Sequence, residues 1–365
     1  MVRSFLIIAF FGFWSVVLGQ SSTLIQPLND AMSESSGLIN IQGRFITHND
    51  SGGESILYEI DTLSGEIARM VTVIGTENTD WEDLASDDTY IYIGDFGNNA
   101  GNRTDLRILR VAISDYIESS TNEVTAETIF FSYNDQVDFS DATFTTNFDA
   151  EAMIVNDGVI FIFTKNWGNQ QTNIYELPAE PGTHSAIFIS NFNSQGLTTG
   201  ADYNQVNDQL VLLGHSIFLQ PFVIDISYFD FGEFDIFIKT NVSIPAGYSG
   251  QAEGIAEING VYYFTSEDSF TGAPGLFRLP ATFTTNLNPQ LSLRAPLIYP
   301  NPASSQLFIE SENFERAEIL DLSGKSLFSS KSPEINVSNL SQGFYVVAIW
   351  AGMAGEVDHI KFVVK

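Results

Sequence analysis

Three glutamates in similar local sequences carry the clearest chemical signal in this chain. Glu82, Glu151 and Glu253 each open a short segment that runs through a polar turn into an almost continuous apolar strand, and two further copies open at Ser36 and Ala201. Carboxylates that converge at one place repel one another, so they bind a cation, share protons or stay hydrated. Calcium, which prefers hard oxygen ligands, is the simplest cation to expect. The expected ligands are Glu82, Asp83, Glu151, Asp202 and Glu253.

The segments after the apolar strands add a second set of polar side chains. In a repeated strand hairpin, the end of the second strand lies beside the start of the first, so these segments should share a rim with the glutamates. Their acid, amide, amine and indole groups suit a polar ligand, such as a sugar or a phosphorylated molecule bridged by a metal. The expected rim residues are Asn49, Asp95, Asn98, Asn99, Lys165, Asn166, Trp167, Ser266 and Glu267.

Two histidines in the same segments are the candidates for proton transfer. His48 and His215 carry imidazoles, which titrate near neutral pH, and a hydrogen-bonded loop histidine is the alternative for each. No complete catalytic set accompanies them, because Gly214-His215-Ser216 lacks the closing glycine of a nucleophile elbow. The acids also have a structural alternative, in which each glutamate accepts backbone N–H groups of the neighbouring repeat and holds the repeats together.

The elements that must position these groups form a repeat of roughly 50 residues. Each copy continues into a third strand, as at 56–60, 173–177 and 275–279, and several continue into a fourth. Four antiparallel strands per repeat make a propeller blade. We therefore expect an all-β chain with a five-bladed propeller. A sixth, degenerate blade would form if 24–28 and 291–293 pair to close the ring, and a solenoid or two sandwiches are the alternatives.

The C-terminal segment carries a different set of signals. Short strands rich in β-branched and aromatic residues are predicted at 307–310, 317–320, 326–329, 345–350 and 360–364. They predict a small Ig-like β-sandwich. Between and around them stand Tyr299-Pro300-Asn301-Pro302, Asp321-Leu322-Ser323-Gly324-Lys325, Leu340-Ser341-Gln342-Gly343-Phe344 and the closing Lys361-Phe362-Val363-Val364-Lys365.

In order and spacing, these motifs resemble the C-terminal sorting domain of type IX secretion over 297–365. The resemblance implies recognition by the type IX secretion machinery, export across the outer membrane, and release or anchoring at the cell surface. An ordinary Ig-like module is the alternative.

The segments around the glutamates show a second, narrower resemblance. Asp80-Trp81-Glu82-Asp83-Leu84, Phe148-Asp149-Ala150-Glu151 and Gln251-Ala252-Glu253-Gly254 are similar to calcium-binding bacterial propellers of the SdiA-regulated and phytase-like esterase families. The resemblance covers these segments within 21–296 and implies metal binding at the three glutamates. It does not extend to hydrolysis, because no nucleophile or phosphate-binding Lys/Arg cluster matches.

The N-terminus and the composition agree with export. Arg3 precedes an apolar run over 5–18, so a signal peptide is expected at 1–19, followed by the propeller at 20–296 and the sorting domain at 297–365. No other run approaches 18 apolar residues, so no transmembrane segment is expected in the mature chain. With 45 acidic against 15 basic residues, the net charge of −30 argues against a nucleic-acid partner. We expect a monomer at the cell surface or outside the cell.

Three functions fit these observations. The preferred one is a binding module that holds a glycan or another surface polymer beside a divalent cation, because no catalytic set is complete. The second is a metal-dependent hydrolase of phosphoesters, esters or polysaccharides, which the acids together with a rim histidine would favour. The third is a structural surface protein in which the acids only join the repeats.

Overall fold

The computed structural model describes residues 20–206, 208–227, 238–270, 272–280, 297–311, 314–321, 325–351 and 357–365. The predicted signal peptide and the segment just before residue 297 lie outside these residues. The chain divides into two compact units, Met1–Phe283 and Thr284–Lys365, which are described separately. Among the described residues, no helix is long and apolar enough to cross a membrane.

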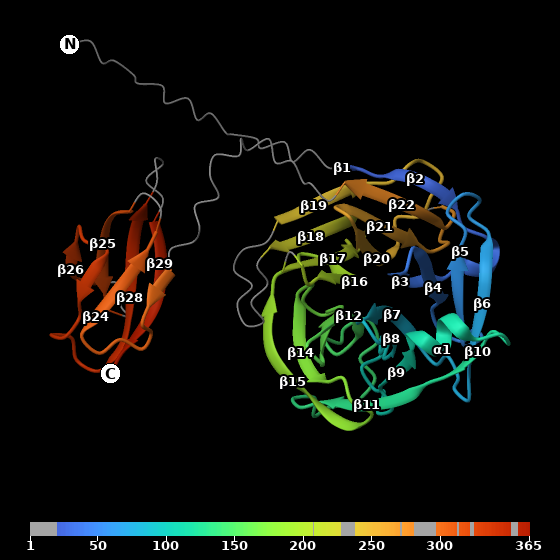
Figure 1. Ribbon diagram of the computed structural model, residues 1–365, viewed down its shortest axis with the longest axis horizontal. Helices are drawn as coiled ribbons and strands as arrows, with labels where there is room; N and C mark the ends of the chain where they lie inside the picture. Colours follow the sequence, from blue (N-terminus) through green and yellow to red (C-terminus); the bar gives the residue numbers. More distant parts are fainter. Residues whose placement is uncertain are drawn as a thin grey trace, which may run out of the picture. The chain divides into compact units, whose positions relative to one another are not determined.

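The first unit is a ring of five blades whose innermost strands surround one central axis, which is called the channel below (Figure 1). Blade 1 contains β3 (Ser35–Ile41), β4 (Arg44–Asn49), β5 (Ile56–Ile60) and β6 (Ile67–Ile74), and β10 (Glu123–Thr125) pairs in parallel with β6. Blade 2 contains β7 (Trp81–Ser86), β8 (Tyr90–Asp95), β9 (Arg107–Ala112) and β11 (Glu127–Tyr133). Blade 3 contains β12 (Ala150–Asn156), β13 (Val159–Thr164), β14 (Thr172–Pro178) and β15 (Gly182–Phe192).

Blades 4 and 5 are completed by the N-terminal segment. Blade 4 contains β16 (Leu197–Asn204), β17 (Gln209–His215), β18 (Pro221–Ser227), β19 (Ile238–Ser243) and the short β1 (Gln20–Ser21). Blade 5 contains β20 (Ala252–Ile258), β21 (Val261–Ser266), β22 (Gly275–Pro280) and, as its outer strand, β2 (Thr23–Pro27). The two short helices are α1 (Ile113–Glu118) and the 3-10 helix η1 (Asp30–Met32).

This arrangement confirms a five-bladed propeller and shows how the ring closes. The inner strands β3, β7, β12, β16 and β20 each contact the inner strands of both neighbouring blades. Leu24 pairs with Phe277 of blade 5, so the segment expected to contribute to a sixth blade is instead the fourth strand of the fifth. Residues 291–293, its expected partner, lie outside the described residues.

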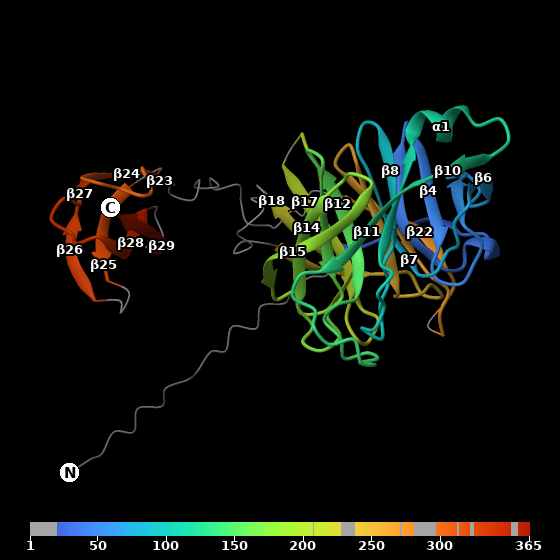
Figure 2. The ribbon, with the colours of Figure 1, turned by 90° about the horizontal axis from the view of Figure 1, so that it is seen from below.

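Five hydrophobic clusters hold the blades together, one at each junction between neighbouring blades. For example, Ile46 and Leu57 of blade 1 pack with Trp81 and Ile91 of blade 2. Because every blade is covered on both faces, its second strand is apolar along its length and does not alternate. This explains the continuous apolar runs that the sequence repeats, and Figure 2 shows the packed blades from the side.

Glycines allow the inner strands to approach this closely. A Cβ atom added to Gly254 would meet the backbone of Ser36 and Gly37 in blade 1, and one added to Gly37 would meet the backbone of Leu84 in blade 2. One added to Gly200 would meet the backbone of Glu253 in blade 5. The channel wall is therefore too tightly packed at these positions for a methyl group.

We expect Gly254→Ala to lower the free energy of unfolding by about 1–3 kcal/mol, because the neighbouring backbone must shift to admit the methyl group. Denaturant unfolding followed by tryptophan fluorescence measures the change. Gly53→Ala is the matched control, because a Cβ there meets nothing within 4 Å. Equal stability of the two variants would contradict the close packing of blades 5 and 1.

The second unit is a β-sandwich. One sheet contains β23 (Leu297–Tyr299), β24 (Gln306–Glu310) and β27 (Glu334–Asn336). The other contains β26 (Ser326–Ser330), β25 (Phe314–Leu320), β28 (Gly343–Ala351) and β29 (Val357–Val364). Leu307 and Ile335 of the first sheet pack against Ile319, Val347 and Phe362 of the second. All five strands predicted for this segment are present.

Candidate metal centre at the channel mouth

The three glutamates occupy one equivalent position in the propeller. Every inner strand has an irregularity in its pairing near its start. The first residues within these irregularities are Ser36, Glu82, Glu151, Thr199 and Glu253. The prediction placed Ala201 here in the fourth blade, and the structure corrects it to Thr199, because the irregularity in β16 falls between Thr198 and Gly200. Local sequence alone does not reveal such a shift of two residues.

A second set of polar side chains comes from the ends of the second strands. It consists of His48, Asp95, Lys165, His215 and Ser266, all of which are buried. Lys165 is its only ammonium group, and its Nζ lies 3.1 Å from Glu151 Oε1. Burial alone would lower the pKa of Lys165, but the charges of Glu151, Glu253 and Glu82 raise it well above its ordinary value.

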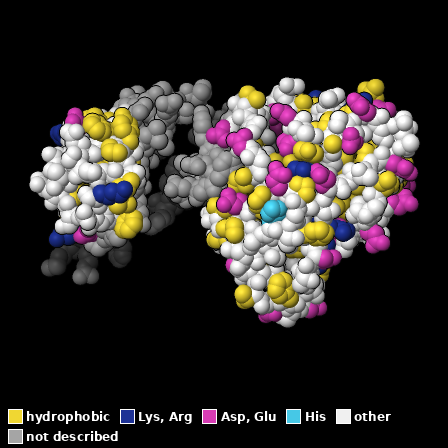
Figure 3. All heavy atoms as spheres, turned by 60° about the horizontal axis from the view of Figure 1, so that its bottom comes forward, with side chains coloured by type: hydrophobic (Ala, Val, Ile, Leu, Met, Phe, Trp, Pro, Cys, Tyr) yellow, Lys and Arg dark blue, Asp and Glu magenta, His cyan; other side chains and the backbone are white. Residues whose placement is uncertain are grey.

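The negative charges of the acids at this mouth are balanced far less completely than the positive charge of Lys165. Burial raises the pKa of Glu82 well above its ordinary value, and Glu151, Asp50 and Asp80 raise it further. Burial is also the main cause of the raised pKa values of Asp50 and Glu253, both about 7, and of Asp80, about 6. One ammonium therefore does not balance this cluster, which favours either protonation or a bound cation. On the part of the first unit drawn in Figure 3, acidic side chains are scattered among polar and apolar ones.

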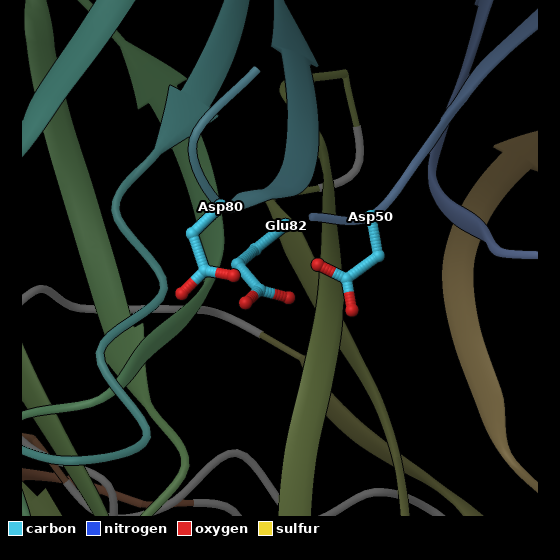
Figure 4. A group of neighbouring side chains, drawn as sticks. All are labelled: Asp50, Asp80 and Glu82. Carbon is cyan, nitrogen blue, oxygen red and sulfur yellow. The ribbon is translucent and has the colours of Figure 1, made fainter. Parts of the chain in front are cut away.

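Asp50, Asp80 and Glu82 bring one carboxylate oxygen each within 4.8 Å of one another. Figure 4 shows the Glu82 carboxylate between the other two. Glu82 Oε1 and Asp50 Oδ1 are buried and have no hydrogen-bond partner among the described residues, whereas Asp80 Oδ2 lies 3.9 Å from a guanidinium nitrogen of Arg103. Three oxygen donors with unused lone pairs fit a calcium ion, which takes carboxylate oxygens at 2.3–2.6 Å.

Asp83 and Asp202, two of the expected ligands, accept backbone hydrogen bonds. Asp83 Oδ2 accepts the N–H groups of Met153, at 2.9 Å, and Ala201, at 3.2 Å. These bonds tie blade 2 to blades 3 and 4. Asp202 Oδ2 accepts the N–H of Glu257 in blade 5. Asp83 and Asp202 therefore join neighbouring blades, which is the role of the acids in the structural alternative. Among the described residues, no backbone N–H donates to Glu82 Oε1 or Glu253 Oε1.

Several expected rim residues serve the loops around the mouth. Asp95 is fully buried and pairs with Arg103, at 3.1 Å, and Arg107, at 2.7 Å. Asn98 donates its side-chain amide to the Phe148 carbonyl and accepts the N–H of Arg103. The backbone carbonyl of Asn99 accepts the N–H of Phe144, and Asn166 bonds the side chains of Thr164 and Asn173.

The remaining expected rim residues either lie beside the acids or have a polar atom without a hydrogen-bond partner among the described residues. The Trp167 indole donates to Asp149 at 2.8 Å, and its ring lies 5.2 Å from Lys165 Nζ. Gln251 donates to Glu267 Oε2 at 2.5 Å. Asn49 Oδ1 and Ser266 Oγ have no hydrogen-bond partner among the described residues.

The two candidate histidines have the same local arrangement in blades 1 and 4. His48 Nδ1 lies 2.9 Å from the Asn49 carbonyl, and His215 Nδ1 lies 2.9 Å from the Ser216 carbonyl. A carbonyl only accepts, so each Nδ1 carries the proton and each Nε2 keeps its lone pair. Burial is the main cause that lowers the pKa of both imidazoles to about 4. Both rings are therefore neutral at pH 7. Among the described residues, neither Nε2 has a hydrogen-bond partner of good geometry, although the Asp83 backbone lies close enough to His48 to raise its pKa.

Sequence reasoning did not include Asp50 and Asp80 among the ligands. A signal for Asp80 was present, since Asp80-Trp81-Glu82 and Asp149-Ala150-Glu151 share an Asp two residues before the glutamate. Asp50 follows the second strand of blade 1 and reaches the site only because blades 1 and 2 are neighbours. No local pattern shows that approach.

Comparison with known proteins identifies the C-terminal unit. Residues 297–365 match the family described as the secretion system C-terminal sorting domain. The chain carries a type IX sorting domain. It is thus a secreted or cell-surface protein, and this domain implies interaction with the secretion machinery.

No curated protein matches this chain. Among solved structures, PorZ, a surface component of the type IX secretion system of Porphyromonas gingivalis, is 11% identical with a TM-score of 0.34. That match covers 91% of this chain and 45% of PorZ, so the chain spans less than half of that protein. The GH43_1 enzyme of Xanthomonas citri is 12% identical with a TM-score of 0.41, covering 71% of this chain and 90% of the enzyme.

An exo-beta-1,3-galactanase of Phanerochaete chrysosporium is 9% identical with a TM-score of 0.45, covering 94% of this chain and all of that one. All three TM-scores lie below 0.5. These likenesses therefore assign no role to the residues at the channel mouth.

Proposed function

We propose that this secreted propeller is a binding protein that holds a calcium ion at Asp50, Asp80 and Glu82 and a polar ligand, such as a glycan, beside it. The observation that carries the proposal is the convergence of three carboxylates within 4.8 Å, with buried and unpartnered oxygens on two of them. An ion there would offset the mutual repulsion of acids that a single lysine does not balance.

The surroundings support a hydroxylated ligand. Phe144 is 59% exposed and lies edge-on to the Trp167 ring, with 4.9 Å between the ring centroids. Trp167 is held in place by Asp149 of the acid cluster. An aromatic surface next to carboxylates and a calcium ion combines apolar contact for a sugar ring with acceptors for its hydroxyl groups. A polyanionic ligand would be repelled by the acidic surface.

Metal-dependent hydrolysis is the second candidate, and one observation favours it. The neutral Nε2 atoms of His48 and His215 are free to accept a proton. Binding is preferred because the described residues around these atoms include no serine or threonine that donates to either of them, and so no activated nucleophile.

Calcium calorimetry on the purified protein tests the proposal. We expect one calcium site in the wild type and an affinity at least 10-fold lower in Asp50→Asn, because a neutral amide replaces a charged ligand. Asp88→Asn is the control, since Asp88 is exposed at the opposite end of β7. If binding is found, glycan binding is then compared with and without a chelator. No calcium binding, or equal binding in Asp50→Asn, would refute the site.

A further inference from the structure

A cavity of about 620 Å³ lies at the end of the channel opposite the carboxylate cluster. The turns between the first and second strands of blades 1 to 4 line it, and they contribute Gln42, Asp87, Asp157 and Gln205. Small-molecule ligands occupy cavities of roughly 300–1,000 Å³ in proteins. None of the three proposed calcium ligands lines this cavity, so a ligand bound here occupies a separate site.

The turns around this cavity are fixed by their backbone and by bonds between blades. Gln42 and Asp157 have φ angles of 52° and 48°, and each precedes a glycine whose φ is also positive. Such pairs form the tight turns that match the twist of a β-hairpin. Gln205 Nε2 donates to Asn156 Oδ1 at 2.5 Å and so joins blade 4 to blade 3. The folded ring therefore shapes the cavity without a ligand.

Part of the lining is apolar. Ile41 and Val155 are buried in the ring, and Ile113, at the start of α1, packs beside the hydrophobic cluster between blades 1 and 2. Tyr203 also lines the cavity, and its hydroxyl donates to Asp208 Oδ1 at 2.7 Å. An aliphatic group that covers these side chains removes apolar surface from water, which is favourable.

The charged part of the lining is acidic. Asp87 and Asp157 line the cavity, and none of its lining residues is a lysine or an arginine. Asp87 is held in place because its Oδ1 accepts the N–H groups of Thr89 and Tyr90, both at 2.7 Å, whereas Asp157 is exposed. These carboxylates attract a cation and repel an anion, and the net charge of −30 acts in the same direction.

We propose that this cavity binds a small aliphatic amine in its protonated form. The ammonium group lies beside Asp87 and Asp157, and the carbon chain covers Ile41, Ile113 and Val155. An ammonium group only donates hydrogen bonds, which matches carboxylates that only accept them. The proposal goes beyond the calcium site and its polar ligand, because the two sites lie at opposite ends of the channel and share no residue.

Hexylammonium chloride is the probe, and hexanol and hexanoate are its neutral and anionic counterparts of equal chain length. Each is titrated by calorimetry into the purified protein saturated with calcium. We expect hexylammonium to bind about 10-fold more tightly than hexanol, because each nearby carboxylate adds about a factor of 5 in water, and hexanoate to bind least. Ethylammonium, with the same charge and a shorter chain, should bind about 10-fold or more weaker than hexylammonium.

Asp157→Asn should weaken hexylammonium binding by about 5-fold, since it removes one charge beside the ammonium group. Asp141→Asn is the matched control, because Asp141 is an exposed aspartate in the loop before β12, at the calcium end of the channel. Thermal melts confirm that both variants fold. Calcium affinity, measured on the same samples, should be equal in Asp157→Asn and the wild type, so the two sites are tested separately.

Two results would overturn the proposal. In the first, the wild type binds hexylammonium no more tightly than hexanol, or does not bind it. In the second, Asp157→Asn binds hexylammonium as tightly as Asp141→Asn does. A failure to bind calcium would refute the site at Asp50 and leave this test unaffected.

Discussion

Replacing Asp83 with alanine is expected to lower the free energy of unfolding by about 3–5 kcal/mol. The Asp83 carboxylate accepts the backbone N–H groups of Leu84, Met153 and Ala201, and so joins three blades at the channel. Alanine would leave these buried donors without partners, at a cost of about 1–3 kcal/mol for each unsatisfied group. Denaturant unfolding of the purified protein measures the loss.

Asp83→Asn is the informative partner variant. Its remaining oxygen can still accept the Met153 and Ala201 N–H groups, so its loss of stability should be smaller. Calcium affinity should stay within a few-fold of the wild type in Asp83→Asn, because Asp83 is absent from the carboxylate cluster of Asp50, Asp80 and Glu82. Wild-type stability of Asp83→Ala would show that these bonds do not hold the ring, and lost calcium binding in Asp83→Asn would return Asp83 to the ligand set.

Glu82→Gln is expected to reduce calcium affinity by about 100-fold or more, because Glu82 lies between the other two ligands (Figure 4) and loses its charge. In the wild type, free calcium at 100 times its dissociation constant should add about 2.7 kcal/mol to the free energy of unfolding. The variant should show almost none of this gain. Thermal unfolding with and without calcium measures the difference.

The effect of pH follows from the raised pKa values of these acids. Burial raises the pKa of Asp50 from 3.8 to about 7 and that of Asp80 from 3.8 to about 6. Between about pH 4 and pH 7 the metal-free folded state therefore holds protons that the unfolded chain has released, and its stability falls as the pH rises. Calcium needs the ionised carboxylates, so its stabilising effect should grow over the same range.

The pH profile also separates Glu82→Gln from its control. Glu82 is itself buried with a pKa well above its ordinary value, so without calcium the variant should lose less stability than the wild type as the pH rises. Asp88→Asn, at the exposed end of β7, should follow the wild type throughout. A calcium effect that is equal at pH 5 and pH 8 would argue against ionised carboxylates as the ligands.

Local patterns determined the elements and their repetition. Continuous apolar strands such as 210–214 and 261–264 predicted sheets covered on both faces, and the structure contains one hydrophobic cluster at each blade junction. The C-terminal motifs predicted both the β-sandwich and the sorting family. These features depend on neighbours in sequence, such as strand propensity and turn residues, which is why they could be read without coordinates.

The chain's own sequence also determined that Glu82, Glu151 and Glu253 are equivalent and that the protein is addressed for export. Only the tertiary structure decided which acids could form a metal site. The contact of blades 1 and 2 brings Asp50 and Glu82 together. Asp83 accepts hydrogen bonds from backbone N–H groups of blades 3 and 4. In blade 4, the irregularity in β16 places Thr199 at the position equivalent to that of the glutamates. Each outcome depends on which atoms of another blade lie within about 3–5 Å, and that is fixed by ring closure and packing, which no local pattern records.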